Sequence, residues 1–228
     1  MTLLVHAIAR RRCAEPPAGL RGSPLEWIAA GELGLWATPL PEGTAEMDRD
    51  DALDHHRIVE ALADREACLP VRFATRVADA TRAGALIVGR EAELSSALVR
   101  VAGRREIAVT LVWPDAAVIP GRGHRVEGGG PGTAYLAARQ HEHAADGARR
   151  KTAEDLARRL EGDLAVEQGD VWHVMCPSDR IALSSSILAR PGEDESLKAR
   201  AIEVVSGYEG VRAVVSGPWP PYSFVGAR

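Results

Sequence analysis

A stiff aromatic segment near the end of the chain, Gly217–Val225, restricts the folds that can contain it. Its sequence, GPWPPYSFV, holds three prolines, and each proline fixes φ near about −65° and lacks a backbone N–H donor. Such a segment cannot pair as a central strand of a sheet. It also holds Trp219, Tyr222 and Phe224, three of the ten aromatic residues in the chain. We therefore expect it either to close a hydrophobic core or to form a preformed docking surface.

The composition is that of an ordinary globular protein. The chain has 228 residues, of which 46% are hydrophobic and 26% charged, enough to bury one large or two small cores. Its net charge of −4 argues against a general nucleic-acid binder, because such proteins neutralise phosphates with excess positive charge. The run Arg10–Arg12 is then best interpreted as a solvated turn.

No cofactor or metal site is predicted. Cys13, Cys68 and Cys176 are widely spaced and show no CxxC pattern, which favours a reducing, cytoplasmic compartment. Adjacent histidines, such as His55 and His56, point about 100° apart on a helix and cannot easily share a metal ion. The chain also has no apolar stretch long enough for a membrane span and no secretory leader pattern.

Residues 1–113 are predicted to form an α+β domain with helices on one face of an antiparallel sheet. Strands are expected at 3–8, 26–30, 33–37, 69–74 and 106–113, with a hairpin turn at Gly31–Glu32. One helix is expected from about residue 44 or 48 to 67, opened by acidic residues. The spacing of Ile87, Leu94, Leu98 and Val101 predicts a second helix.

Residues 114–132 differ in composition from the rest of the chain. Glycines and prolines dominate this stretch, so it is predicted to be an interdomain linker. Residues 133–228 are predicted to form a second α+β domain. It should begin with a long charged helix to about residue 161, contain strands at 164–166, 171–175, 184–189 and 211–215 and a helix at 193–206, and end in the proline-aromatic segment.

Several blocks of sequence point to one family. HHRIVE at 55–60, LPVRFAT at 69–75, YLAAR at 135–139 and GPWPPYSF at 217–224 follow one another along the chain. Together they resemble the gas vesicle F/L (GvpF/GvpL) family, with Ala74 standing where the family often has glycine. The resemblance implies a ferredoxin-like first domain.

The resemblance also implies a non-catalytic, chaperone-like accessory role in gas vesicle assembly. The implied partners are the hydrophobic shell protein GvpA and other gas vesicle proteins, and the implied location is the cytoplasm and the gas vesicle. Aromatic residues and arginine dominate protein–protein hot spots. The predicted contact residues are therefore Trp219, Tyr222 and Phe224, together with Arg72 and Tyr135. Burial of the three aromatic rings in a core is an equally good interpretation.

Two further alternatives stay open from the sequence. Arg72 could instead pair with a helix carboxylate such as Glu60, in a structural role. The chain could also be a ferredoxin-like enzyme of the monooxygenase or isomerase type, with a pocket near His56 and Arg72, although a fold does not imply a function. His56 itself is predicted to face the core, on the same side of its helix as Leu53 and Val59.

Overall fold

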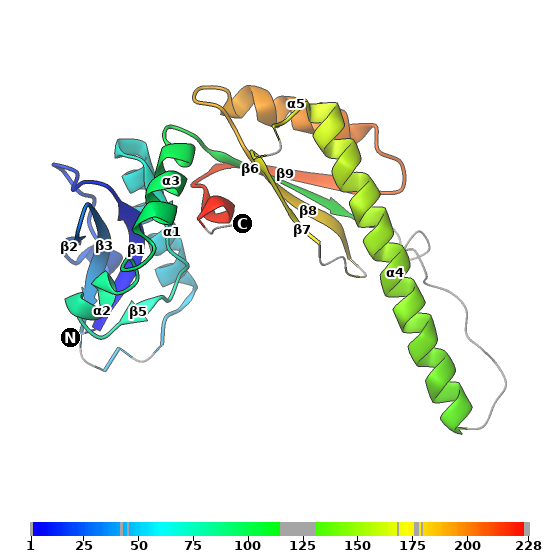
Figure 1. The fold of residues 1–228 in the computed structure, drawn as a ribbon, viewed down its shortest axis with the longest axis horizontal. Helices are drawn as coiled ribbons and strands as arrows, with labels where there is room; N and C mark the ends of the chain where they lie inside the picture. Colours follow the sequence, from blue (N-terminus) through cyan, green and yellow to red (C-terminus); the bar gives the residue numbers. More distant parts are fainter. Residues whose placement is uncertain are drawn as a thin grey trace. The chain divides into compact units, whose positions relative to one another are not determined.

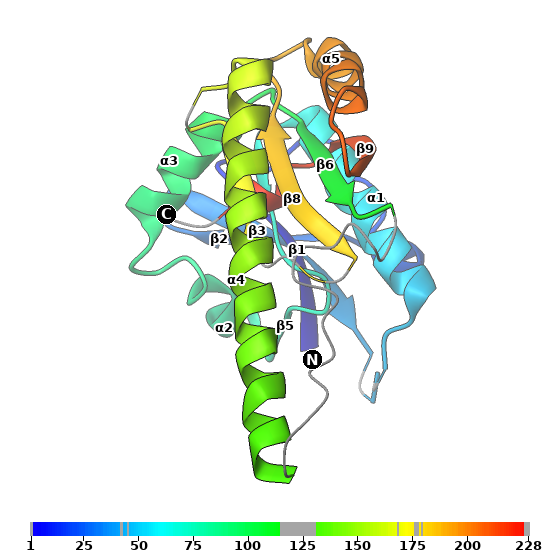
Figure 2. The ribbon, with the colours of Figure 1, turned by 90° about the vertical axis from the view of Figure 1, so that its right-hand side faces the viewer.

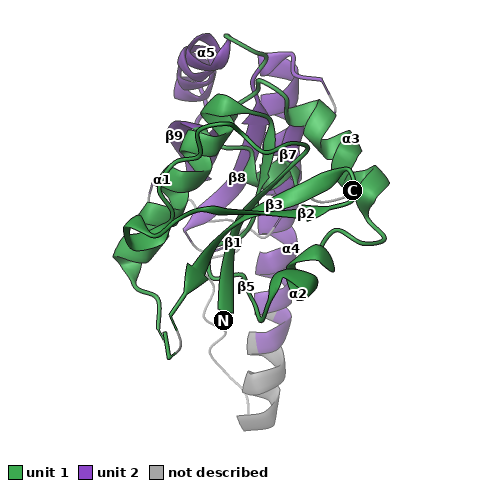
Figure 3. Cartoon of the chain, turned by 90° about the vertical axis from the view of Figure 1, so that its left-hand side faces the viewer, with its two compact units in different colours: residues 1–106, 190–192, 219–228 green, residues 107–189, 193–218 purple. Residues whose placement is uncertain are grey.

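The chain folds into two compact units, each built around its own sheet (Figures 1 and 3). The computed structural model describes residues 2–41, 43–44, 46–114, 131–167, 169–175, 178 and 180–225. Unit 1 contains residues 1–106, 190–192 and 219–228, and unit 2 contains residues 107–189 and 193–218. The predicted α+β class is confirmed: helices α1–α5 accompany two sheets of antiparallel strands.

The sheet of unit 1 has the strand order β2-β3-β1-β4, with β5 also paired to β1. These strands are β1 (Thr2–Ala9), β2 (Glu26–Ala30), β3 (Leu33–Leu40), β4 (Cys68–Pro70) and β5 (Arg76–Val77). A ferredoxin-like β-α-β-β-α-β unit has a helix between its first two strands. Here that connection holds only the 3₁₀ turn η1 (Leu20–Gly22), so the unit departs from the expected plan at this point.

The central strand β1 is buried almost throughout. It pairs antiparallel with β3 and β4, and its register with β3 shifts between Val5 and Ala7. This irregularity is a β-bulge, which re-aims the side chains that follow it. His6 occupies the bulge and is fully buried. The hydrophobic core against β1 includes Ile58 and Leu62 of helix α1 (Arg49–Arg65).

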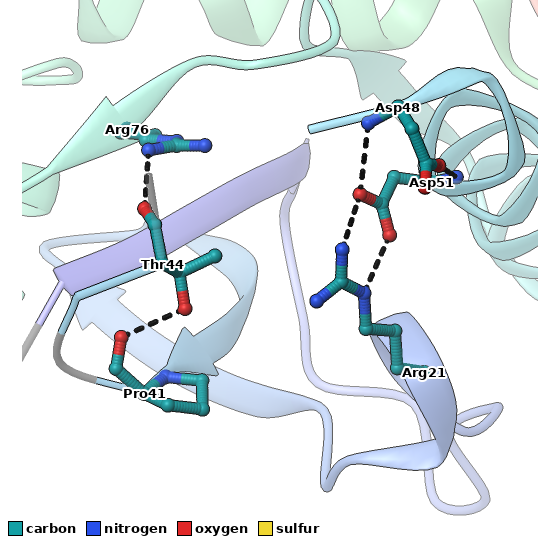
Figure 4. A network of polar contacts seen from close by, with 6 residues as sticks. All are labelled: Arg21, Pro41, Thr44, Asp48, Asp51 and Arg76. Carbon is teal, nitrogen blue, oxygen red and sulfur yellow. Dashed lines mark hydrogen bonds and ion pairs between the residues drawn. The ribbon is translucent and has the colours of Figure 1, made fainter. Parts of the chain in front are cut away.

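Helix α1 begins at a capping box that is also an ion-pair site (Figure 4). The Asp51 N–H donates to Asp48 Oδ1 at 2.9 Å, and the Asp48 N–H donates to Asp51 Oδ2 at 3.1 Å. Arg21 of η1 donates to both oxygens of Asp51, at 2.7 and 2.6 Å. Asp51 is buried and its pKa is lowered by the hydrogen bond from Arg21. Close by, Arg76 Nη1 donates to the Thr44 carbonyl at 2.9 Å.

Two more helices complete unit 1. The short α2 (Ala80–Gly84) begins at Asp79, whose side chain accepts a hydrogen bond from the Arg82 N–H. Helix α3 (Glu91–Val101) buries Leu94, Leu98 and Val101, three of the four residues whose spacing predicted it.

Unit 2 has a four-stranded sheet in the order β7-β8-β6-β9. Its strands are β6 (Glu106–Val112), β7 (Val171–Val174), β8 (Ile181–Leu188) and β9 (Arg212–Trp219). Helix α4 (Pro131–Leu164) runs along β8, and α5 (Asp194–Ser206) packs beside α4 (Figure 2). Side chains of both helices share one core with β6, β7 and β8. The strand predicted at 164–166 is absent, because α4 continues to Leu164.

Strand β9 runs further into the proline-rich segment than expected. It includes Gly217, Pro218 and Trp219 and lies at the edge of the sheet. An edge strand tolerates proline because one side of the strand needs no ladder hydrogen bonds. The segment is thus excluded from a central position, as its prolines predict, but not from the sheet.

The boundaries of the two units differ from those of the predicted domains, both at β6 and near the C-terminus. Strand β6 belongs to unit 2 from residue 107 onward because it pairs with β8 and β9. Residues 219–228 belong to unit 1, in which Phe224 is buried and Ser223 is hydrogen-bonded to Glu106. Most of the predicted linker, residues 115–130, lies outside the described residues.

Among the helices that the structure describes, none has the length and apolar character needed to cross a bilayer.

Candidate functional site

The segment that follows β4 turns away from the sheet and exposes Arg72. Strand β4 ends at Pro70, and the Val71 N–H donates to the His6 carbonyl at 2.8 Å. A turn then forms, in which the Thr75 N–H and Oγ1–H both donate to the Arg72 carbonyl, at 3.2 and 2.6 Å. Ala74 adopts φ 64° within this turn. The strand predicted over 69–74 therefore stops at residue 70, because the chain turns where the alternation of side chains would have to continue.

A chain of buried hydrogen bonds holds this segment from behind. The Val71 carbonyl can only accept, so His55 Nε2 donates to it, at 3.0 Å. In a neutral imidazole the other nitrogen then accepts, so His55 Nδ1 receives the proton of His6 Nδ1 at 2.9 Å. His6 Nε2 accepts from the Thr38 hydroxyl at 2.8 Å, and Thr38 Oγ1 accepts from the Leu20 N–H at 3.0 Å.

Burial keeps both imidazoles of this chain neutral. Desolvation lowers the pKa of His6 to about 3, with a smaller contribution from His55. Desolvation also lowers the pKa of His55. The His55 and Phe73 rings meet in a T-shaped arrangement, with ring centroids 5.5 Å apart. The hydrogen bonds of His6 and His55 therefore connect the exposed turn to the bulge in β1. Because both rings are neutral, each ring nitrogen has one fixed role as donor or acceptor.

The aromatic segment is anchored in unit 1 by a buried carboxylate. Glu106 accepts hydrogen bonds from the Ser223 N–H at 2.9 Å and the Ser223 hydroxyl at 2.8 Å. Both atoms belong to the 3₁₀ turn η3 (Tyr222–Phe224). Phe224 is 2% exposed, and the Arg100 guanidinium lies 5.1 Å from its ring centroid. Phe224 is thus a core residue that pins this end of the chain.

Trp219 and Tyr222 lie at the surface instead. They are 38% and 36% exposed. Both rings contact His56 of α1, with centroid separations of 5.3 Å for Trp219 and 6.3 Å for Tyr222. Desolvation raises the pKa of the Tyr222 hydroxyl above its ordinary value. The aromatic segment therefore supplies both a core plug and a surface.

The exposed turn and the aromatic segment meet along a groove of about 520 Å³ in unit 1. We call it the Arg72 groove. Its lining is mostly apolar and consists of Ile8, Pro70, Val71, Arg72, Phe73, Thr75, Leu86, Arg90, Leu94, Tyr222 and Val225. The volume falls within the range of about 300–1,000 Å³ typical of small-ligand pockets. Among these described residues no carboxylate, imidazole or thiol lines the groove.

The two arginines of the groove differ in their surroundings. Arg90 donates to both oxygens of Glu93, at 3.0 and 2.7 Å, and this pairing raises its pKa. Arg72 is exposed, and its guanidinium forms no ion pair with any of the described residues. Among the described residues Arg72 and Glu60 form no ion pair, so this predicted alternative is not found. Arg72 is thus the cation of the groove that is open to a partner.

Comparison with known proteins identifies the family. The family model for gas vesicle synthesis protein GvpL/GvpF matches residues 3–226. The chain belongs to the GvpL/GvpF family. It is 30% identical to gas vesicle protein L of Streptomyces sp. (strain CB03234), over 93% of this chain and 84% of that protein. The resemblance drawn from the four sequence blocks is confirmed.

Solved GvpF structures share the fold. The crystal structure of GvpF from Microcystis aeruginosa matches with a TM-score of 0.72 and 11% identity, covering 99% of each chain. That of GvpF from Anabaena sp. PCC7120 matches with a TM-score of 0.69 and 16% identity, covering 100% of this chain and 99% of that chain. At these identities the likeness shows the fold alone.

In this GvpL/GvpF chain the predicted contact residues fall into separate places. Arg72 and Tyr222 line the same groove, and Trp219 stands beside Tyr222 on His56. Phe224 is buried. Tyr135 lies within helix α4 of unit 2, and its side chain is outside the described residues.

The prediction that His56 faces the core was wrong, because the neighbouring His55 occupies that face of α1. The buried histidine is His55, while Leu53, placed with the core from the sequence, is 44% exposed. His55, Ile58, Val59 and Leu62 form the buried stripe, and their spacing of three and four residues was available as a signal. His56 does not line the Arg72 groove, so the pocket proposed for an enzyme near His56 and Arg72 is not formed by that pair.

Among the described residues no group of three or more His, Cys, Asp or Glu side chains is placed to hold a metal ion.

Proposed function

We propose that this chain is a non-catalytic accessory protein of gas vesicle assembly, which binds the shell protein GvpA and other gas vesicle proteins in the cytoplasm. The family match over residues 3–226 supports the gas vesicle role. The Arg72 groove is the observation that carries the binding role. It offers apolar area, the partly exposed ring of Tyr222 and an arginine that forms no ion pair with the described residues.

The character of the groove favours binding over chemistry. General acid–base catalysis needs a titratable side chain within reach of the reacting group. The described lining offers the cations Arg72 and Arg90, the hydroxyl of Thr75 and a Tyr222 whose pKa burial raises. Tyrosine and arginine are enriched at the centres of protein–protein interfaces. By covering apolar shell subunits before they assemble, such a surface would keep them from aggregating.

The test is an aggregation and capture experiment with GvpA. Light scattering is followed while denatured GvpA is diluted into buffer, with and without the full-length chain, and complexes are then captured on the tagged chain. We expect suppressed scattering and capture of GvpA. Arg72→Glu should weaken both effects, and Arg12→Glu, a charge reversal at an exposed arginine outside the groove, should leave them unchanged.

Unchanged scattering and no captured GvpA with the wild-type chain would contradict the binding proposal. Turnover of a small metabolite by the purified chain would contradict the proposal that it is not an enzyme.

A further inference from the structure

The Arg72 groove combines an apolar floor with a single open cation, and this combination restricts what can occupy it. We propose that it receives an amphipathic helical segment of a partner protein, in which aliphatic side chains fill the groove and one Asp or Glu carboxylate pairs with Arg72. This inference rests on the proposed function, since the partner it describes is a gas vesicle protein.

Charge decides which kind of segment fits. Covering the groove would remove the Arg72 guanidinium from water, and an unpaired cation pays a large desolvation penalty. An occupant with aliphatic groups only would leave this charge unpaired, and a basic occupant would repel it. Arg90 cannot take the same role, because Glu93 already holds it through two hydrogen bonds. A carboxylate can meet Arg72 in the planar, two-bond geometry that arginine favours.

Backbone hydrogen bonding decides against an extended occupant. A peptide that adds as a strand needs free N–H and C=O groups along the edge it joins. The Val71 N–H is already bonded to His6, the Thr75 N–H to Arg72, and the Thr75 carbonyl accepts from the Val5 N–H at 3.0 Å. These backbone groups are therefore unavailable to an added strand, which favours recognition through side chains. A helix, which satisfies its own backbone and presents residues at i, i+3 and i+4 on one face, suits such a groove.

The volume of the groove and the position of Tyr222 agree with a helical occupant. A volume of about 520 Å³ has room for several aliphatic side chains. Leu86 and Leu94 contribute apolar area, and Tyr222 adds a partly exposed ring. Because the His6–His55 hydrogen bonds hold Val71 from behind, the wall that carries Arg72 is preorganised. Preorganisation lowers the entropic cost of binding.

Charge reversal across the interface tests the proposal. Fluorescent 20-residue peptides that tile the GvpA sequence are titrated with the full-length chain, and binding is followed by anisotropy. We expect at least one peptide with an amphipathic pattern and an acidic residue to bind. Arg72→Glu should weaken that binding at least about tenfold, while Arg12→Glu should not change it. Replacing the peptide's acidic residue with lysine should weaken binding to the wild type and restore it for Arg72→Glu.

The outcomes separate this inference from the proposed function. If a peptide binds the wild type and Arg72→Glu equally, the carboxylate pairing is wrong and the binding role stands. If whole GvpA is captured but none of its peptides binds, the helical segment is wrong and the binding role stands. If neither whole GvpA nor any peptide binds, the proposed function fails. Self-association of the chain that depends on Arg72 would assign the groove to a second copy and overturn the inference.

Discussion

His6 and His55 lie 49 residues apart in the chain, yet their Nδ1 atoms share a buried hydrogen bond of 2.9 Å. Each ring is neutral, and each nitrogen has one fixed role as donor or acceptor. The pair connects the bulge of β1 to the Val71 carbonyl, and thus to the turn that exposes Arg72. The turn that exposes Arg72 is therefore held by two buried histidines that do not line the groove.

Stability should fall as the pH is lowered from 7 toward 5. The pKa of each histidine is lower in the folded chain than the ordinary value of 6.5, and for His6 it is about 3. Below 6.5 the unfolded chain binds a proton that the folded chain does not, so acid favours unfolding. For His6 alone the slope should approach about 1.4 kcal/mol per pH unit.

Urea denaturation at pH 7.5, 6 and 5 measures this slope. His6→Gln should lower stability at pH 7.5 and flatten the pH dependence, and His143→Gln, at an exposed histidine, should do neither. An equal pH slope in wild type and His6→Gln would show that the buried pair does not control acid sensitivity.

Loss of the Asp51 carboxylate should destabilise unit 1. Asp51 accepts two hydrogen bonds from Arg21 and one from the Asp48 N–H (Figure 4). Asp51→Ala leaves those donors without their acceptor and should cost about 2 kcal/mol. The neighbouring Asp50 is exposed, so Asp50→Ala is the matched control and should stay within about 0.5 kcal/mol. Equal unfolding free energies for the two variants would show that the Asp51–Arg21 ion pair does not stabilise unit 1.

Ala74→Gly should stabilise the chain. Ala74 has φ 64°, a conformation that costs a residue with a Cβ about 1–2 kcal/mol. Glycine removes that cost but adds about 0.4–1 kcal/mol of backbone entropy to the unfolded state. The net gain should be about 0.5–1 kcal/mol. Ala74→Val should act in the opposite direction, because a β-branched side chain suits positive φ even less. Thermal denaturation of both variants measures these effects. A glycine variant less stable than the wild type would show that Ala74 is not strained in this turn.

Removing the Glu106 carboxylate should release the aromatic turn. Glu106→Ala deprives the Ser223 N–H and hydroxyl of a charged acceptor, which should cost about 2 kcal/mol. Ser223→Ala removes only the hydroxyl bond and should cost less. Amide hydrogen exchange at residues 222–224 should accelerate in the order wild type, Ser223→Ala, Glu106→Ala. Unchanged exchange in Glu106→Ala would mean that Phe224 alone anchors this end of the chain.

Local signals in the sequence predicted four of the helices and the Gly31 hairpin correctly, but the strand predicted at 164–166 is not formed. The acidic first turn of α1, the Gly31 hairpin and the helix at 193–206 all appear close to their expected bounds. Each depends on neighbouring residues alone. The pairing of β6 with β9 joins strands about a hundred residues apart, and no local pattern specifies such a contact.

The candidate site was predicted only in part for a similar reason. Arg72 and Tyr222 could be named from residue chemistry and family resemblance, but their common groove depends on the turn at Ala74 and on Glu106 holding Ser223. Phe224 was named with the docking residues, and its burial is set by packing with residues distant in sequence, such as Arg100. His55 was recoverable, since its spacing to Ile58 and Leu62 marks the buried face of α1.

Hydrogen exchange of the full-length chain with and without GvpA shows whether GvpA binds in the Arg72 groove. We expect new protection within residues 70–75, 86–94 and 222–225, the segments that contribute most of the lining of the Arg72 groove, and loss of that protection in Arg72→Glu. Protection that appears only elsewhere in the chain, or none at all under conditions where GvpA is captured, would contradict binding of GvpA in this groove.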